Sequence, residues 1–520
     1  MKKIILPLVL LLVLSCNKRS KTSNRDTSIL SQPILIEDDD WKFEGTENLI
    51  LVPENRNNPK SREIAIHFFR FPAKEKSKLP PVVFLGAGPG EPYSTDVFFK
   101  GKRAKAWRFE LNFVNQKRDV ILINQRGNPK SPGLSISNFR YKWSNGGTLD
   151  QPFDLGLMNR NRKEAYAAYL AMFQSKGIDP KGYDVIHFVD DIEAIRQKLN
   201  YEKIALIGNS FATQWALGYI QRYPDNVDRA LFSGIEPLDN NYDDPEGIWK
   251  VLEKIDAYAQ TDATISQDLP EGGLLKAFKK IITRLEKHPE KVSLKNKENS
   301  EEDIIVVGAD DLRYAIMNPY SGSYRGDIES WPKYITEMYR GDFRFLAMLS
   351  KGRIYNSSSI MINPLFNNSI GISKEREQII NSRPAKKWLG DINAHYTSTR
   401  DICPAPKVNG EFRQHVKHDI PILLIQGDMD LQTPHENAEF LMNYLKNGHL
   451  ISVKRGFHNA KRALIFQDSI LINKVYNFMN IDFDQIDFSL FKKTLPSTYE
   501  LPKFNFWSIE GESLFEKYNK

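Results

Sequence analysis

A serine in a tight turn is the first feature of the sequence that could carry out chemistry. Ser210 lies in Gly208-Asn-Ser-Phe-Ala212, between an apolar run over 203–207 and a helical pattern over 214–223. A strand–turn–helix of this kind exposes the serine hydroxyl, and small residues two positions either side let strand and helix approach. Ala212 stands where glycine is usual and adds one methyl group. Because serine and glycine are common in turns, the motif needs support from partners elsewhere.

An acidic turn and a histidine supply those partners, because each follows a later apolar, strand-like run. They are Asp430 and His458. A serine hydroxyl becomes nucleophilic when a histidine takes its proton, and the imidazole needs a carboxylate to fix its tautomer and stabilise its charge. The chain order Ser, Asp, His is that of α/β-hydrolases. We therefore predict a catalytic triad with Asp430 as the acid; Asp428 is the alternative, better explained as a turn residue, and His435 is expected to be structural.

A glycine-rich turn offers donors for a developing oxyanion. Gly86-Ala-Gly-Pro-Gly90 follows the apolar run 81–85. We predict that the amides of Ala87, Gly88 and Phe211, the residue after the nucleophile, form the oxyanion hole. A phosphate-binding turn is the alternative, but the segment lacks both the P-loop ending and the dinucleotide spacing.

Five short apolar runs separated by helical patterns must position these residues. Unbroken apolar strands of this kind indicate a mostly parallel sheet that helices cover on both faces, which is an α/β fold. The runs are 81–85, 119–123, 203–207, 229–233 and 420–425.

The interval between the last two runs is too long for an ordinary crossover, so it predicts an insertion. Its pattern is mostly helical, and we expect a lid over the carboxyl edge of the sheet; the charged stretch 276–303 is expected as a solvated helix and loop. The predicted organisation is a signal peptide (1–15), a polar tether (16–40), a hydrolase core (41–239 and 408–481), a helical lid (240–407) and a C-terminal strap (482–520).

The N-terminal segment has the pattern of an export signal. A basic start precedes eleven mostly apolar residues, Ile4 to Leu14, and then Ser15-Cys16. The run is shorter than the roughly 20 residues that span a bilayer, and it fits the apolar region of a signal peptide. Ser15-Cys16 resembles a lipobox, which predicts cleavage before Cys16, lipidation of its thiol, and an exported bacterial lipoprotein of the cell envelope. An ordinary secretory signal is the alternative.

Composition excludes several classes of protein. The 520 residues are 41% hydrophobic and 26% charged, and the net charge is +7. This is a globular composition without the basic footprint of a nucleic-acid-binding protein. Two cysteines, Cys16 and Cys403, provide neither a disulfide framework nor a thiolate metal site. We expect no metal or organic cofactor, and membrane contact only through the lipid anchor.

The motifs together resemble the α/β-hydrolase serine peptidases typified by proline iminopeptidase and bacterial tripeptidyl aminopeptidase. The resemblance covers about residues 45–240 and 415–480. Three residues, Asn124, Pro129 and Ala212, depart from the family pattern, so the resemblance is to a divergent member. The similar segments are the 86–90 turn, the Arg126 loop at 124–131, the nucleophile region at 190–227, the acid turn at 427–434 and the opening at 49–73.

The resemblance implies a function and two substrate contacts. A lid glutamate in the family commonly binds the substrate's free amine, which directs attention to the acidic segment with Glu236, Asp239, Asp243, Asp244 and Glu246; a solvated loop is the alternative. Arg126 is expected either to bind a substrate carbonyl or carboxylate or to brace its loop. The sequence thus predicts a serine hydrolase that cleaves short peptides from a free N-terminus. A carboxylesterase and a non-catalytic binding lipoprotein remain open, and the oligomeric state is not predicted.

Overall fold

The computed structural model describes residues 29–38, 41–90, 92–93, 101–128, 130–131, 142–143, 147–295, 301–317, 325–351, 356–357, 362–483 and 487–519. The predicted signal peptide and Cys16 lie outside these residues, as does Pro129.

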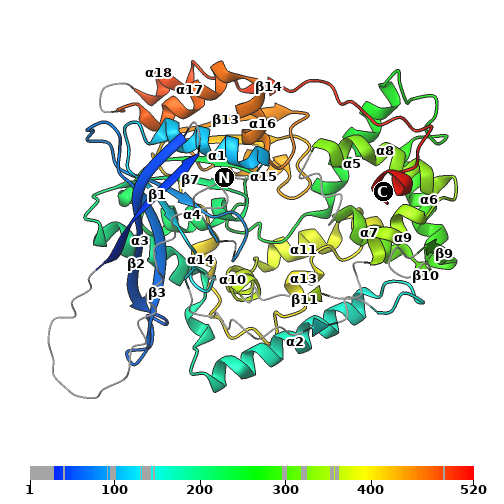
Figure 1. Cartoon of the computed structure of the whole chain (residues 1–520), viewed down its shortest axis with the longest axis horizontal. Coiled ribbons are helices and arrows are strands. Elements are labelled where there is room, and N and C mark those ends of the chain that lie inside the picture. The colour runs from blue at the N-terminus through cyan, green and yellow to red at the C-terminus, as the bar shows by residue number, and fades with distance from the viewer. Residues whose placement is uncertain are drawn as a thin grey trace.

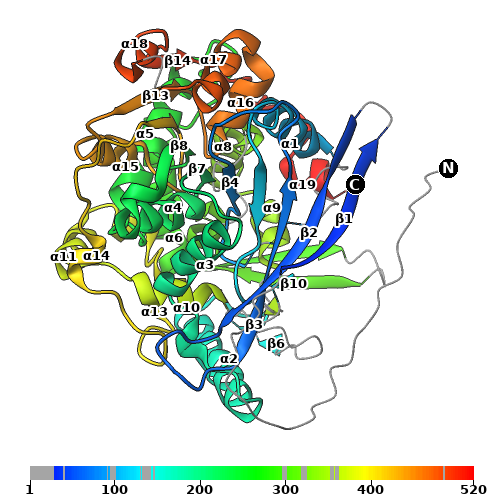
Figure 2. The same cartoon turned by 90° about the vertical axis from the view of Figure 1, so that its left-hand side faces the viewer.

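A ten-stranded sheet forms the centre of the molecule (Figures 1 and 2). Its first strands are antiparallel, and the seven from β5 to β14 are parallel neighbours. Parallel strands bring their carboxyl ends to one edge, where the candidate site is expected. In spatial order the strands are β1 (Leu30–Asp38), β2 (Trp41–Pro53), β3 (Glu63–Phe71), β5 (Val120–Ile123), β4 (Val82–Leu85), β7 (Ile204–Asn209), β8 (Val227–Ser233), β12 (Ile422–Gly427), β13 (Gly448–Lys454) and β14 (Thr498–Glu500).

Alternate side chains of these strands enter two different apolar cores. In β4, Val83 and Leu85 belong to one core, and Val82 and Phe84 belong to the other. This is why the strands read as continuous apolar runs: both faces are covered by helices. Figure 2 shows α3 and α4 on one side of the sheet, and α1, α16 and α17 on the other. The helices around the sheet are α1 (Gly101–Val114), α2 (Leu155–Ser175), α3 (Val185–Lys198), α4 (Phe211–Arg222), α15 (His435–Met442), α16 (Ala460–Gln467), α17 (Ser469–Asn480) and α18 (Phe488–Lys492), with short 3₁₀ turns η2 (Pro180–Gly182) and η3 (Pro224–Asn226).

The segment between β8 and β12 has a core of its own, as the predicted insertion requires. It is mostly helical. The first part of its charged stretch forms the expected helix, α6 (Leu274–Lys287), but the second part contributes to an antiparallel hairpin, β9 (Glu290–Lys295) with β10 (Glu302–Val307), where a loop was expected. The preceding helix, α6, buries Phe278, Ile282 and Leu285. Its helices are α5 (Pro245–Thr261), α6 (Leu274–Lys287), α7 (Ala309–Met317), α8 (Arg325–Tyr339), α9 (Arg344–Ser350), α10 (Ile362–Ile370), α11 (Lys374–Ser382), α12 (Lys386–Leu389), α13 (Ala394–Thr397) and α14 (Gly410–Arg413); its two-residue strand β11 (Asn356–Ser357) pairs with β6 (Lys142–Trp143).

The C-terminal segment connects the two cores. After β14 joins the sheet, Phe504, Phe506 and Leu514 enter the core of the insertion. Lys333 of α8 donates to the carbonyl oxygens of Ser508 and Ile509 at 2.9 Å each. The last helix, α19 (Leu514–Tyr518), lies among the insertion's helices in Figure 1. The predicted strap therefore packs on the lid.

The predicted boundaries of the hydrolase core need two corrections. Residues 30–38 were expected to belong to the polar tether, yet they form the edge strand β1, with Ile36 buried. Residues 498–500 of the strap also belong to the sheet. Each segment satisfies its backbone hydrogen bonds by pairing with a neighbouring strand.

Candidate active site

Ser210 lies in the strained turn that the sequence predicts. It follows β7 and precedes α4, with φ 59° and ψ −136°. A non-glycine residue in this region costs about 1–3 kcal/mol, and such strain is concentrated at functional sites. A Cβ on Gly208 would approach the Ala212 carbonyl oxygen to 2.9 Å, so the turn needs glycine there. Ala212 is fully buried, and its methyl group fits.

His458 is held by Asp430 at the carboxyl edge of the sheet. The His458 Nδ1 lies 3.1 Å from Oδ1 and 3.0 Å from Oδ2 of Asp430. Burial alone would raise the pKa of Asp430, but the His458 charge and hydrogen bonds from His458 and Thr433 outweigh it and lower this pKa. The carboxylate therefore stays ionised and stabilises an imidazolium. Gln426 donates to Asp430 at 3.0 Å and accepts from the amide of Ile235 at 2.8 Å.

The two alternative residues of the sequence analysis have structural contacts. Asp428 accepts a hydrogen bond from the amide of Arg455 at 2.7 Å. His435 lies 2.8 Å from the hydroxyl of Ser452. Asp430 is the acid that contacts His458.

Gly234 brings the serine and the histidine together. It follows β8 with φ +61°, and a Cβ there would lie 3.0 Å from His458 Cε1 and 3.3 Å from the Ser210 amide nitrogen. The imidazole and the nucleophile turn thus share one glycine as a neighbour. No hydrogen bond joins the Ser210 hydroxyl to His458 among the described residues. In unliganded enzymes this bond is often long, and it tightens when substrate binds.

The expected oxyanion donors lie in turns at the same edge of the sheet. Gln125 accepts from the Gly90 amide at 2.6 Å and donates to the carbonyl oxygens of Gly86 and Gly88. Because a trans peptide places N–H opposite C=O, the bond to Gly86 turns the Ala87 amide away from Gln125. Phe211 begins α4, so its amide has no intrahelical acceptor. β4 pairs with β7, which makes the two turns neighbours.

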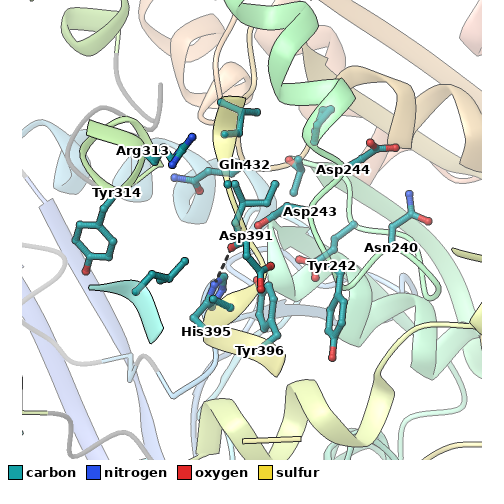
Figure 3. A pocket seen from close by; sticks show the side chains of 18 of the residues that line it. Asn240, Tyr242, Asp243, Asp244, Arg313, Tyr314, Asp391, His395, Tyr396 and Gln432 are labelled. Carbon is teal, nitrogen blue, oxygen red and sulfur yellow. Dashed lines mark hydrogen bonds between the residues drawn. The ribbon is translucent and has the colours of Figure 1, made fainter. Parts of the chain in front are cut away.

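A cavity of about 460 Å³ opens on Ser210. Figure 3 shows part of its lining. Tyr242 and Tyr396 stack in its wall, with ring centroids 5.3 Å apart and planes 7° apart. The insertion provides most of the other residues that line the cavity. Residues of the cavity that come from the turn before α2 and from α2 are Phe153, Leu155, Met158 and Arg162.

Two carboxylic acids, Glu236 and Asp243, line this cavity together with Ser210. The Glu236 amide donates to Thr213 Oγ1 at 2.8 Å, and Thr213 Oγ1 donates to the Ser210 carbonyl oxygen at 2.8 Å. The side chain of Asn393 holds the backbone of Asp243 through two hydrogen bonds of 2.8 and 2.9 Å. Among the described residues, neither acid's side chain forms an ion pair or accepts a hydrogen bond. They are free to bind a ligand.

The pKa values of both acids reflect this enclosure. Burial, with the charge of Asp243 as a second cause, raises the pKa of Glu236 to about 8. Burial, with the Asp430 carboxylate next, raises the pKa of Asp243 to about 7, although Arg376 and His458 oppose the shift. Strongly perturbed acids in a cavity are candidates for a functional site.

The other acids of the segment have partners. Asp239 accepts from the Ser373 amide and hydroxyl at 2.6 Å each. Asp244 caps α5 and pairs with Arg383 at 2.8 Å. Glu246 accepts from the Ala385 amide.

Arg126 braces its loop and is absent from the cavity's lining. Its guanidinium is fully buried and binds both carboxylate oxygens of Asp191, at 2.7 and 2.6 Å, and the carbonyl oxygens of Glu54 and Gly182. All its donor groups therefore face the protein. Of the two roles expected for Arg126, these contacts support the bracing of its loop and not the substrate contact.

Sequence reasoning missed the wall that α2 contributes. Met158 and Arg162 lie in a helix of mixed polarity that has no motif, so no signal in the sequence indicates that they face the site. Asp243 was one of several acids in the segment that the sequence could not distinguish as candidates for binding the substrate's amine.

No helix among the described residues is both long and apolar enough to cross a bilayer. They also contain no group of three or more His, Cys, Asp or Glu side chains placed to hold a metal ion.

Two family models match parts of the chain. Residues 80–268, which include Ser210 and Glu236, match the family model of the alpha/beta hydrolase fold. The chain has the α/β-hydrolase fold. Residues 392–463 of this chain, with Asp430 and His458, match the model of TAP-like proteins. No curated protein matches the sequence.

Solved structures similar to this hydrolase include three bacterial enzymes. A serine hydrolase from the polyaromatic-hydrocarbon-degrading bacterium Cycloclasticus zankles is 11% identical, with 85% of this chain and 99% of the other covered and a TM-score of 0.34. An esterase from Exiguobacterium antarcticum is 10% identical (82% and 98% covered, TM-score 0.34). An alpha/beta fold family hydrolase from Bacillus anthracis str. Sterne is 14% identical (84% and 99% covered, TM-score 0.34).

Proposed function

We propose that this α/β-hydrolase is a serine aminopeptidase that cleaves short peptides from a free N-terminus. The observation that carries the proposal is the pair of unpaired acids, Glu236 and Asp243, in the cavity that opens on Ser210. A substrate ammonium between them would ionise at least one carboxyl group and form charge-assisted hydrogen bonds. The match to TAP-like proteins supports the same class of reaction.

The proposed mechanism uses the triad and the two turns. Ser210 attacks the scissile carbonyl carbon while His458 takes the hydroxyl proton, and Asp430 stabilises the imidazolium. The tetrahedral oxyanion accepts hydrogen bonds from the amide of Phe211 and from the Ala87–Gly88 turn. His458 then protonates the leaving amine. Water, activated by the same histidine, hydrolyses the acyl-enzyme and releases the short N-terminal fragment.

We further propose that the enzyme acts in the cell envelope, with Cys16 lipidated after removal of residues 1–15. The basic start, the apolar run and Ser15-Cys16 support this proposal. The tether between Cys16 and β1 would then separate the catalytic body from the membrane surface.

A panel of three substrates and one variant tests the proposed reaction. The soluble chain 17–520 is assayed with an Ala-containing tripeptide p-nitroanilide, its N-acetylated form and a p-nitrophenyl ester, and is also treated with a fluorophosphonate probe. We expect turnover of the free-amine anilide and labelling that Ser210→Ala abolishes, with activity reduced by several powers of ten. The exposed Ser382→Ala is the control. Turnover of the ester alone would replace the aminopeptidase with a carboxylesterase, and absence of both labelling and turnover would indicate a binding protein.

A further inference from the structure

Arg162 of α2 is a cation in the cavity that has no carboxylate partner among the described residues. Its Nη1 is buried without a hydrogen-bond partner, and its Nη2 lies 3.7 Å from the sulfur of Met158. The other two arginines of the cavity are paired. Arg313 binds Glu286 at 2.6 Å and Asp310 at 2.9 Å, and Arg376 lies 3.4 Å from Asp244.

The surroundings of Arg162 leave its charge uncompensated. Burial lowers the pKa of Arg162, and only the Tyr314 phenol opposes this; a guanidinium nevertheless stays protonated in proteins. The side chain of His395 is exposed and lines the cavity, and desolvation there together with the charge of Arg162 lowers its pKa to about 3. An unpaired buried charge is costly unless a ligand neutralises it.

Among the described residues, the cavity wall thus carries two unpaired acids beside Ser210 and an unpaired cation, Arg162, elsewhere. Glu236 and Asp243 lie beside the nucleophile, where Asp243 is near enough to Asp430 and His458 for their charges to shift its pKa. Arg162 lies with Tyr314 and His395. In Figure 3 these two side chains are on the side of the cavity away from Asn240 and Tyr242. A volume of about 460 Å³ lies within the ~300–1,000 Å³ typical of small-molecule sites, so the cavity has room for one short ligand.

We propose that Arg162 binds the C-terminal carboxylate of a short peptide whose amine lies at Glu236 and Asp243. This inference rests on the proposed aminopeptidase function and narrows it: the substrates are free oligopeptides of a few residues rather than the N-termini of proteins. The planar guanidinium can donate two parallel hydrogen bonds to a carboxylate. A protein chain would present a neutral amide at this point and leave the charge of Arg162 unpaired.

Binding measurements with both termini varied separate this inference from the proposed function. Ser210→Ala protein, which cannot turn over peptide, is titrated calorimetrically with trialanine, trialanine amide, N-acetyl-trialanine and Ala-Ala-Glu amide. The affinity for trialanine divided by that for its amide tests the role of Arg162. The affinity for trialanine divided by that for N-acetyl-trialanine tests the amine site independently. The glutamate peptide shows whether a side-chain carboxylate substitutes for the terminal one.

We expect trialanine to bind about 10- to 100-fold more tightly than its amide, which is the range for hydrogen bonds to a charged group. Adding Arg162→Gln should reduce that ratio to near one without changing the affinity for the amide. Arg160→Gln, an exposed arginine of the same helix, should leave the ratio unchanged.

Three results would overturn the inference: equal affinities for acid and amide in the parent protein, a preference that survives Arg162→Gln, or no binding of any of the four peptides. If Arg162→Gln does not fold, the ratio of the affinities for trialanine and its amide in the Ser210→Ala protein still tests the inference. An intact acid preference with no discrimination against the acetylated peptide would preserve the role of Arg162 and refute the amine site.

Discussion

Glu236 and Asp243 face one cavity, and burial together with the Asp243 carboxylate raises the pKa of Glu236 to about 8. The pKa of Asp243 is also raised, to about 7, so the charge of both acids near neutral pH depends on what binds between them. A bound ammonium favours the ionised state, whereas a neutral N-acetyl group does not. This difference is the physical basis on which the proposed aminopeptidase would discriminate between a free and a blocked N-terminus.

The raised pKa of Glu236 predicts how stability depends on pH. Folded Glu236 takes up its proton at about pH 8, whereas its ordinary value is 4.5. Between these values the folded state binds more protons than the unfolded state, so the free energy of unfolding falls as pH rises through this window. Glu236→Gln removes this loss. Relative to the wild type, it should gain ~2 kcal/mol from pH 5 to pH 9, less than the full linkage value because water reaches the cavity.

Urea unfolding at both pH values checks this expectation. Glu246→Gln is the matched control, since Glu246 lies in the same segment and binds the Ala385 amide outside the cavity. If the stability difference between Glu236→Gln and wild type is the same at pH 5 and pH 9, the carboxyl group is not enclosed as the structure indicates.

The close approach of Gly234 to His458 predicts that a larger residue at position 234 lowers the activity. In Gly234→Ala the new methyl group would lie 3.0 Å from His458 Cε1, at a positive φ that L-residues rarely adopt. The imidazole has to move, and a displacement of about 1 Å can cost about 100-fold in rate. We expect kcat to fall by at least that factor for peptide and ester substrates alike, while circular dichroism stays native.

Gly410→Ala serves as the control for this variant, because its Cβ meets open space. Normal kcat in Gly234→Ala would show that His458 does not depend on this contact, and the assigned general base would have to be reconsidered.

The proposed lipid anchor predicts a cysteine-specific modification. In a bacterial host that processes lipoproteins, full-length protein should incorporate an alkyne-tagged fatty acid and partition into the detergent phase. Cys16→Ala should lose the label and retain the full precursor length, because processing requires the lipidated thiol. Cys403→Ala, the other cysteine, should still be labelled. Label that persists in Cys16→Ala would refute the anchor.

The sequence allowed much of the fold to be predicted because its signals are local. The parallel strands are buried on both faces and read as continuous apolar runs. The turn at Ser210 and the order of Asp430 and His458 are equally local patterns. By contrast, the sequence did not indicate β1, which follows a polar segment, or the β9–β10 hairpin, which is rich in charged residues. These strands form because they pair with a neighbouring strand, and their composition alone does not predict them.

The cavity could be predicted only in part, because distant segments build it. Glu236 was a candidate among several nearby acids, and only tertiary contacts separate it from Asp239, which binds Ser373. Arg126 belongs to a motif and Arg162 does not, yet the structure buries the first in an ion pair and exposes the second to the cavity. A sequence motif therefore indicates where a residue lies in the fold. Whether its side chain lines the cavity depends on which residues from distant segments pack against it.

The most direct test of the central claim is how far Glu236 contributes to the preference for a free amine. The measurement is the kcat/KM for a tripeptide p-nitroanilide divided by that for its N-acetylated form, in wild type, Glu236→Gln and the control Glu246→Gln. We predict a large ratio in wild type and the control, and a 10- to 100-fold smaller ratio in Glu236→Gln, through loss of a charge-assisted hydrogen bond. Hydrolysis of a p-nitrophenyl ester should change little. An unchanged ratio in Glu236→Gln, or a wild-type ratio near one, would contradict the account.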